Sequence, residues 1–349
     1  MRTRLLILAA FSLAVIACVN ETPYEPGFPG DKITINAGLE SPVPATRTLR
    51  NEGDGSVLWA PGDCISVFYG SGNAGGSKFT SQNMENSRSA EFKGTLDVQS
   101  TGDMFWGVYP YDDATECDGS SLTVTLPAVQ TAAPGTFAPG TFISIGRSEN
   151  LSMSFYNLCG GVRFRVSKQG VKRVTLRSFD GPIAGKVKVV FDGSGHPVVS
   201  EILEGSDAIV LEAPDGQTLL PGNNYYFSVL PHEFGEHCFA VTFETGSEAG
   251  VYDRTQAFTV SRSVFEYFNS PIDSNVSWAE VKGIISTPAE LQQFLESDAQ
   301  AAQAGDSYLI VADIDMSGVA IASAASFAGE LDGGGRTISG ISSSKPLIE

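Results

Sequence analysis

Residues 153–166 read MSFYNLCGGVRFRV, and this stretch shows the pattern that decides the fold. In VRFRV, apolar and charged side chains alternate one by one, which is the period of a strand with one buried face. Similar segments recur from residue 31 to residue 275, among them KITINA, CISVFY, LTVTL, KVKVVF, YYFSVL and FAVTFE. β-branched and aromatic residues are frequent in them, and no segment of useful length in this span has a helical period. The pattern predicts an all-β fold.

Clusters of Gly, Pro, Asn and Asp separate the predicted strands, as in NEGDGS, FDGSGHP and APDGQ. Such clusters are typical of turns, and many short strands at this spacing favour antiparallel β-sandwiches. A polar gap at residues 147–150 divides the pattern into two halves, each with enough strands for one sandwich. We therefore expect an N-terminal β-sandwich at residues 31–150 and a second one at residues 151–275.

Longer motifs appear in a definite order over the same span. TRTLRNEGDGSVLWAPGDCISVFYG joins a Thr-Arg pair, a turn, a tryptophan and Gly-Asp to a strand, and FWGVYPYDDAT, LPAVQTAAPGTFAPGTFISIG, SFYNLCGGVRFRV and LLPGNNYYFSVLP follow it. In these motifs the chain resembles the fimbrillin-like family of Bacteroides-type bacteria, many of whose members are subunits, anchors or tips of type V pili. The resemblance implies two transthyretin-like antiparallel β-sandwiches in series on a lipid-anchored precursor.

The resemblance also implies a route of assembly. In polymerising relatives an arginine-specific protease cuts after an early strand, and a donor strand of the next subunit fills the groove that opens. An unpaired sheet edge is a template for such strand addition. Here the early strand would run from Ile33 to Ala37, and the processing sites would be Arg47 and Arg50. The alternative is that both arginines are ordinary loop residues. Polymerising relatives end with their second sandwich, whereas this chain continues.

The N-terminal segment MRTRLLILAAFSLAVIA has two arginines before an apolar run that is too short to span a bilayer. The run ends at Ala17 and Cys18, and Val15-Ile16-Ala17-Cys18 resembles the lipobox of bacterial lipoproteins. The resemblance implies a signal peptide at residues 1–17, acylation of Cys18 with palmitate among the acyl chains, and a linker at residues 18–30. Residue 19 is Val and not Asp, so by the resemblance nothing retains the protein at the inner membrane, and we expect a lipid-anchored protein of the cell outer membrane. Surface exposure is expected as well, although Cys18-Val-Asn-Glu21 lacks the acidic run of known surface-export signals and leaves export to the outer face open. The alternative is an ordinary secretory signal with a chance cysteine.

The chain has 349 residues and a net charge of −18, which makes it a poor candidate for binding nucleic acid. Besides Cys18 it has four cysteines, an even number that permits disulfides with three alternative pairings. Three of them lie in strand-like stretches, where a cysteine serves well as a small buried apolar residue. We expect free buried thiols and leave disulfides open for Cys64, Cys117, Cys159 and Cys238.

The composition changes after residue 275, where a linker and one short helix are expected at residues 276–305. In STPAELQQFLESDAQAAQAG, Thr287 is placed to cap the helix, Pro288 to begin it and Glu290 to close a capping box. Gly305 suits the C-terminal cap. The segment therefore predicts a helix with a well-defined start.

Residues 306–349 contain DIDMSG and FAGELDGGGRTISGI. This segment resembles the first rungs of the right-handed β-helix domains of bacterial surface adhesins. About three stacked units are needed for a stable stack, so we expect an incomplete β-helix. The three glycines at 333–335 do not form a nucleotide-binding loop, because no Lys-Ser/Thr pair and no helix follow them. They indicate a corner where the backbone turns sharply.

No segment predicts catalysis or a bound cofactor. HEFGEH, residues 232–237, has the wrong spacing for a zinc-binding HExxH helix and predicts a hairpin turn. Asp313 and Asp315 match the start of a calcium loop, but Ala324 stands where its bidentate acid is required, so a β-helix corner is preferred over calcium. No Gly-x-Ser-x-Gly motif and no recognisable Cys-His pair are present. We expect a non-enzymatic protein without a metal or cofactor.

Two functions remain as hypotheses. The preferred one is a cell-surface lipoprotein of the fimbrillin-like family that acts in adhesion or as a fimbrial subunit or tip component. Its expected partners are outer-membrane lipid through Cys18, other fimbrial subunits, and host or bacterial surface ligands. The alternative is a surface glycan-binding lipoprotein that captures polysaccharide, with the aromatic residues of MFWGVYPY and NNYYFSV either stacking on sugars or packing in the core.

Overall fold

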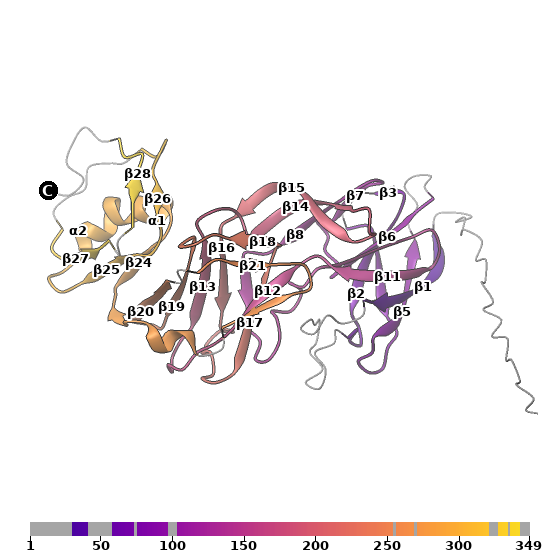
Figure 1. The fold of residues 1–349 in the computed structure, drawn as a ribbon, viewed down its shortest axis with the longest axis horizontal. Coiled ribbons are helices and arrows are strands. Elements are labelled where there is room, and N and C mark those ends of the chain that lie inside the picture. The colour runs from indigo at the N-terminus through magenta and orange to yellow at the C-terminus, as the bar shows by residue number, and fades with distance from the viewer. Residues whose placement is uncertain are drawn as a thin grey trace, which may run out of the picture.

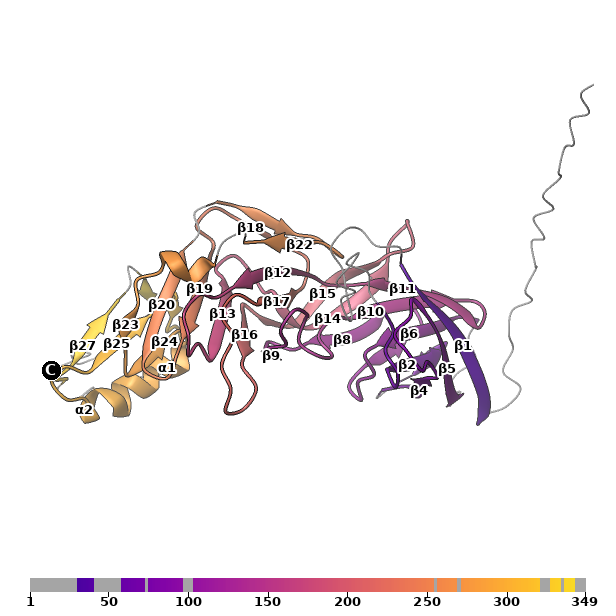
Figure 2. The ribbon, with the colours of Figure 1, turned by 90° about the horizontal axis from the view of Figure 1, so that it is seen from below.

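The structure is a computed structural model that describes residues 30–40, 58–72, 75–96, 103–253, 256–268, 271–320, 327–333 and 336–342. Three bodies follow one another along the long axis of the molecule, and both views show them in a row (Figure 1, Figure 2). A barrel lies at one end, a larger β body in the middle, and a small body with the helix at the other end. The all-β fold class with one short helical segment is confirmed.

The first body is a seven-stranded closed barrel with the strand order β1-β11-β10-β6-β2-β4-β5. Its strands are β1 (Asp31–Leu39), β2 (Cys64–Tyr69), β4 (Ser77–Ser81), β5 (Ser89–Leu96), β6 (Phe105–Tyr109), β10 (Ser144–Ser148) and β11 (Ser152–Asn157). Parallel pairing of β1 with β11 closes the ring, while the other pairs are antiparallel. The pairing of β1 with β11 therefore closes the expected antiparallel β-sandwich into a barrel.

Strands β2 and β6 are buried on both faces. Because successive side chains point to opposite faces, Phe105 lies in the barrel interior while Trp106 packs against the middle body. On β2, Val67 likewise lies in the barrel interior and Phe68 packs against the middle body. Gly107 faces the interior, where a Cβ atom would lie 2.6 Å from Met153 and Phe155. These strands therefore join the two bodies through one shared wall.

Four sheets build the middle body and its link to the barrel. Their orders are β17-β12-β22, β23-β20-β19-β13-β16-β9, β15-β14-β8-β7-β3 and β18-β21. The strands are β3 (Ser71–Gly72), β7 (Glu116–Asp118), β8 (Leu122–Leu126), β9 (Val129–Thr131), β12 (Gly160–Arg165), β13 (Arg173–Ser178), β14 (Ala184–Phe191), β15 (Pro197–Ser206), β16 (Ala208–Glu212), β17 (Asn224–Val229), β18 (His232–Phe234), β19 (Phe239–Glu244), β20 (Glu248–Asp253), β21 (Phe258–Val260), β22 (Phe265–Tyr267) and β23 (Ala279–Glu280). The 3₁₀ turn Ile272–Asn275 lies between β22 and β23. The β15-β14-β8-β7-β3 sheet runs from the middle body towards the barrel (Figure 1).

The sequence predicted a boundary between two sandwiches at residues 150 and 151, but the barrel sheet continues across this point. Strand β11 follows that point but pairs with β1 and β10 in the barrel. Strands β8 and β9 precede it but pair with β14 and β16 of the middle body. The polar gap is only the turn between β10 and β11, because a local turn signal does not report which strands it joins. The division into folding units at 31–150 and 151–275 stays a prediction.

The small body combines the helix with parallel strands. Thr287 Oγ1 accepts a hydrogen bond from the Glu290 N–H at 3.2 Å, and the Glu290 carboxylate accepts one from the Thr287 N–H at 3.1 Å, so the predicted capping box is confirmed. The helical segment runs through α1 (Pro288–Gln293), a π-helical turn (Phe294–Asp298) and α2 (Ala299–Ala301). It packs on β24 (Gly283–Ile285), β25 (Ser307–Ile310), β26 (Ile314–Asp315), β27 (Glu330–Asp332) and β28 (Ile338–Ser339).

These last strands stack in parallel. The order β24-β25-β27 forms one ladder, and β26-β28 forms a second. Asp313 ties the layers together by accepting a hydrogen bond from the Thr337 N–H at 2.7 Å. Gly340 has a φ of +67°, and a Cβ atom there would collide with Asp315 and Ser317. The described strands thus form one parallel ladder of three strands and one of two. The resemblance to adhesin β-helices stays a prediction, and Gly334 and Gly335 lie outside the described residues.

Among the described residues, no helix combines the length and the apolar composition that crossing a membrane would require.

Candidate functional site

The candidate site is strand β1 and the groove that it fills in the barrel. The predicted early strand, Ile33 to Ala37, lies within β1, so a strand at this place is confirmed. The side chains of Ile33, Ile35 and Ala37 are at most 8% exposed and point into the barrel, whereas Lys32 and Asn36 face solvent. The alternation seen in KITINA is therefore the alternation of one buried face.

Strand β1 pairs with one strand on each side, but the pairing with β5 is longer than the pairing with β11. It pairs antiparallel with β5 from Asp31 to Gly38, and parallel with β11 only from Asn36 to Leu39. The Asn36 N–H also donates to the Leu151 carbonyl at 2.8 Å. The first half of β1 is thus held mainly by β5 and by its buried isoleucines. This is the geometry of a strand that fills a slot in a sheet.

The wall behind β1 is aromatic. Trp59, the tryptophan of the WAPGD motif, is fully buried, and its ring meets Phe92, Tyr109 and Phe155 edge to face at centroid distances of 4.9, 5.3 and 5.2 Å. Such contacts add to the energy of burial and set the ring positions. The groove is therefore shaped by rigid side chains that belong to the barrel and not to β1.

Glu40 directly follows β1 and lies at the centre of a polar cluster. Its carboxylate accepts hydrogen bonds from Arg262 Nη1 at 2.8 and 2.9 Å, from the Asn157 N–H at 3.0 Å, and from the Ser263 hydroxyl. The Glu40 side chain is 12% exposed and that of Arg262 is 23% exposed. Arg262 and Ser263 form the turn between β21 and β22, so the end of β1 is held by the middle body.

Sequence reasoning did not find this cluster. Neither segment has a distinctive sequence signal, because Glu40 is an acid after a strand and Arg262-Ser263 is an Arg-Ser pair in a turn. Glu40 and Arg262 are 222 residues apart. By contrast, the predicted sites Cys18, Arg47 and Arg50 lie outside the described residues.

A second polar cluster gathers around Asp180, at the His232 end of HEFGEH. Asp180 accepts hydrogen bonds from Ser178 at 2.8 Å, from His232 Nε2 at 2.8 Å and from the Gly235 N–H at 2.8 Å. Burial opposes ionisation of Asp180, but these hydrogen bonds outweigh it and lower its pKa to about 2. The predicted hairpin turn over HEFGEH is wrong: residues 232–234 form β18, which pairs with β21 and not with β19. Only the second half of the motif is a turn, which the Cys238 N–H closes by donating to the Gly235 carbonyl at 3.3 Å.

This Asp180 cluster does not have the geometry of a catalytic triad. Ser178 and Asp180 both contact Nε2 of His232, at 3.2 and 2.8 Å. In a triad the acid and the nucleophile use different ring nitrogens, so that the imidazole can take the nucleophile's proton while the acid orients it. Here the histidine links strand β18 to Ser178 at the end of β13 and to Asp180 two residues later. In the described part of the chain no three His, Cys, Asp or Glu side chains are placed to hold a metal ion.

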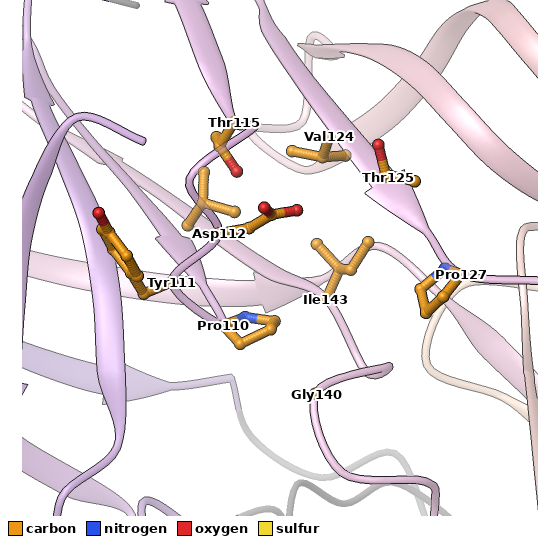
Figure 3. A pocket seen from close by; sticks show the side chains of 10 residues that line it. Pro110, Tyr111, Asp112, Thr115, Val124, Thr125, Pro127, Gly140 and Ile143 are labelled. Carbon is orange, nitrogen blue, oxygen red and sulfur yellow. The ribbon is translucent and has the colours of Figure 1, made fainter. Parts of the chain in front are cut away.

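A cavity of about 340 Å³ lies between the barrel and the middle body (Figure 3). Figure 3 shows the Asp112 carboxylate directed towards the side where Val124 and Ile143 lie. The ring of Tyr111 is covered by Lys78 Nζ at 4.7 Å from its centroid, and its hydroxyl donates to Asp113 at 2.6 Å. The cavity therefore offers mainly apolar walls and one carboxylate.

Most of the aromatic residues considered for sugar stacking lie in the core. Phe105, Trp106, Tyr225 and Phe227 are at most 1% exposed. Within the described residues, the exposed large apolar side chains include one aromatic, Tyr267, and Arg163 lies over its ring at 4.0 Å. The prediction of core packing is confirmed for these four side chains but not for Tyr111 of MFWGVYPY, which lines the cavity.

The four cysteines besides Cys18 are free thiols, as expected. Cys117 and Cys159 are buried, whereas Cys64 and Cys238 are partly exposed. Burial raises the pKa of the Cys117 thiol to about 11 and that of Cys159 to about 12. Thiols with such pKa values are protonated near neutral pH and are poor nucleophiles.

Comparison with known proteins gives distant structural neighbours. No family model and no curated protein match the chain. A proposed cell adhesion protein of Bacteroides ovatus is 11% identical, with a TM-score of 0.40, over 72% of this chain and 96% of that one. A proposed cell adhesion protein of Bacteroides uniformis is 14% identical, with a TM-score of 0.37, over 71% and 95%. A fimbrial assembly protein of Parabacteroides distasonis is 13% identical, with a TM-score of 0.30, over 71% and 95%. At these values the chain is similar to the three proteins in outline only.

Proposed function

We propose that the protein is a non-catalytic cell-surface lipoprotein of the fimbrillin-like type, acting in adhesion or as a fimbrial subunit or tip component. Cys18 is its lipid anchor in the outer membrane, and β1 is the strand that leaves when the protein assembles. The motifs shared with the family support this proposal. The observation that carries it is the position of β1, which fills a slot in the barrel between β5 and β11.

The energetics of β1 suit an exchange of strands. Each buried isoleucine of β1 contributes about 1.5–3 kcal/mol, and ladder hydrogen bonds to β5 and β11 add to this. Loss of β1 alone would expose the aromatic wall and unpaired backbone groups of the groove. An extended strand from another subunit would restore both kinds of contact, so exchange costs far less than release. Such a slot favours assembly once β1 is no longer tethered.

The proposed processing sites, Arg47 and Arg50, separate β1 from the rest of the chain. A cut at either arginine leaves Cys18 and β1 on one fragment and the remaining barrel strands on the other. The cut would therefore remove the covalent link between the lipid anchor and the body, and only the contacts of β1 would hold the two together.

Limited digestion with trypsin tests this proposal. Cutting of the full chain at Arg47 or Arg50 should yield SDS-resistant ladders, because donor strands fill the emptied grooves. An Arg47→Ala/Arg50→Ala variant is the matched control and should stay monomeric. A nicked chain that remains a monomer would contradict assembly by strand exchange.

Anchoring is tested separately. Cells fed a labelled palmitate analogue should label the wild-type protein in the outer-membrane fraction. The Cys18→Ala variant should carry no label and should leave that fraction. Equal membrane retention of both forms would contradict the role of Cys18.

A further inference from the structure

The polar cluster at the end of β1 links the barrel to the middle body. Glu40, Asn157, Arg262 and Ser263, here called the Glu40 clasp, join the first strand of the barrel to the turn between β21 and β22. The Glu40 N–H donates to the Phe155 carbonyl at 3.0 Å, and Arg88 Nη2 donates to the Glu40 carbonyl at 3.3 Å. Both the backbone and the side chain of Glu40 are therefore held.

The receiving half of the clasp is built without Glu40. Asn157 Nδ2 donates to the Ser263 hydroxyl at 3.0 Å, and Asn157 Oδ1 accepts from the Ser144 hydroxyl at 2.7 Å. Arg262 Nη1 also donates to the Asn157 carbonyl at 3.2 Å. Ser263 is 1% exposed and has a φ of +62°, a conformation that few non-glycine residues adopt. These contacts keep the donors in place around the position of one carboxylate.

Departure of β1 would leave those donors without their acceptor. Arg262 would lose both contacts with Glu40, and the Asn157 N–H and the buried Ser263 hydroxyl would lose theirs. A donor without a partner is costly where it is buried, as the Ser263 hydroxyl is, and removing one side of a partly buried charged pair such as Glu40–Arg262 weakens binding. A replacement strand with apolar side chains alone would leave these donors without an acceptor, and the complex would be less stable.

We propose that the groove selects a donor strand that carries a carboxylate at the position of Glu40. The partner is an extended segment of another polypeptide that runs in the direction of β1. It has large apolar residues at the positions of Ile33 and Ile35, a small residue at that of Ala37, and Asp or Glu three residues further on. This inference rests on the proposed strand exchange and names the chemistry of the strand that enters.

Peptide exchange into the nicked full chain tests the inference. The probes are fluorescent peptides with the sequence of residues 31–40, DKITINAGLE, and the same peptide with Glu40→Gln. The parent peptide should bind, and the Glu40→Gln peptide should bind at least about tenfold more weakly, because Arg262 would lose a charged partner. A Lys32→Gln peptide is the matched control and should bind like the parent, since Lys32 faces solvent.

The Arg262→Met variant completes the test. In this variant the two peptides should bind with nearly equal affinity, since the cation that distinguishes them is gone. Equal binding of both peptides to the wild-type nicked chain would overturn the inference and leave strand exchange standing. Failure of every peptide to enter the nicked chain would overturn strand exchange and the inference together. The peptide comparison is made on unchanged protein, so it holds even where Arg262→Met does not fold.

Discussion

Individual cysteine residues differ in what their surroundings allow. Cys117 and Cys159 lie in the main core, while Cys64 and Cys238 are partly exposed. We expect iodoacetamide at pH 8 to modify Cys64 and Cys238 in the native protein and to reach Cys117 and Cys159 only after unfolding. Burial blocks access to Cys117 and Cys159 and raises the pKa of both thiols. Partial desolvation and the neighbouring Asp180 raise the pKa of Cys238 too, which slows its reaction without blocking access to it. Peptide mass spectrometry with and without urea measures this. Rapid native labelling of Cys159 would contradict the packing described.

Asp180 should make stability depend on acid pH. Its pKa is about 2 in the folded protein against 3.8 for an ordinary aspartate, so the folded state favours the ionised form. This contribution is complete above pH of about 4 and is lost as the pH falls towards about 2. Urea unfolding should show wild type more stable than Asp180→Asn at pH 6, with the difference shrinking below pH of about 3. Asp215→Asn, in an exposed loop, is the control and should differ little from wild type at any pH.

Among the elements, the helix has the clearest local code. The capping box satisfies two backbone N–H groups at its start, so Thr287→Ala should lower the unfolding free energy of the small body by about 1 kcal/mol. Thermal melts followed by circular dichroism measure the change. Gln300→Ala, an exposed position in the same helical segment, should cost much less. Equal effects of both substitutions would mean that the cap does not contribute.

The strands show where local patterns stop. Alternation in KITINA correctly placed Ile33, Ile35 and Ala37 on a buried face, because a strand with one solvent-exposed face alternates apolar and polar side chains. The same rule does not describe β2 and β6, whose two faces are both buried in different cores. A pattern along one strand cannot reveal what covers its second face.

At the scale of the molecule, the described residues form three clusters of buried apolar side chains, which determine the parts that unfold together. The barrel interior and the main core meet at the two faces of β2 and β6, whereas the small body has its own cluster. We expect scanning calorimetry to show one transition for the barrel and middle body and another for the small body. Phe294→Ala, which removes about 3–5 kcal/mol of packing, should lower only the second. Leu122→Ala should lower only the first. A single transition that both variants shift equally would contradict this division.

The sequence by itself determined the features that depend on near neighbours: the strands, the turns between them, the capped helix and the buried face of β1. Only the tertiary structure decided that β1 closes a barrel, that strands on both sides of residue 150 are shared between bodies, and that Glu40 meets Arg262. These features depend on which segments become neighbours in space. Strand pairing and a salt bridge across 222 residues leave no periodic or local trace, because each residue satisfies its own local preferences equally well without the other.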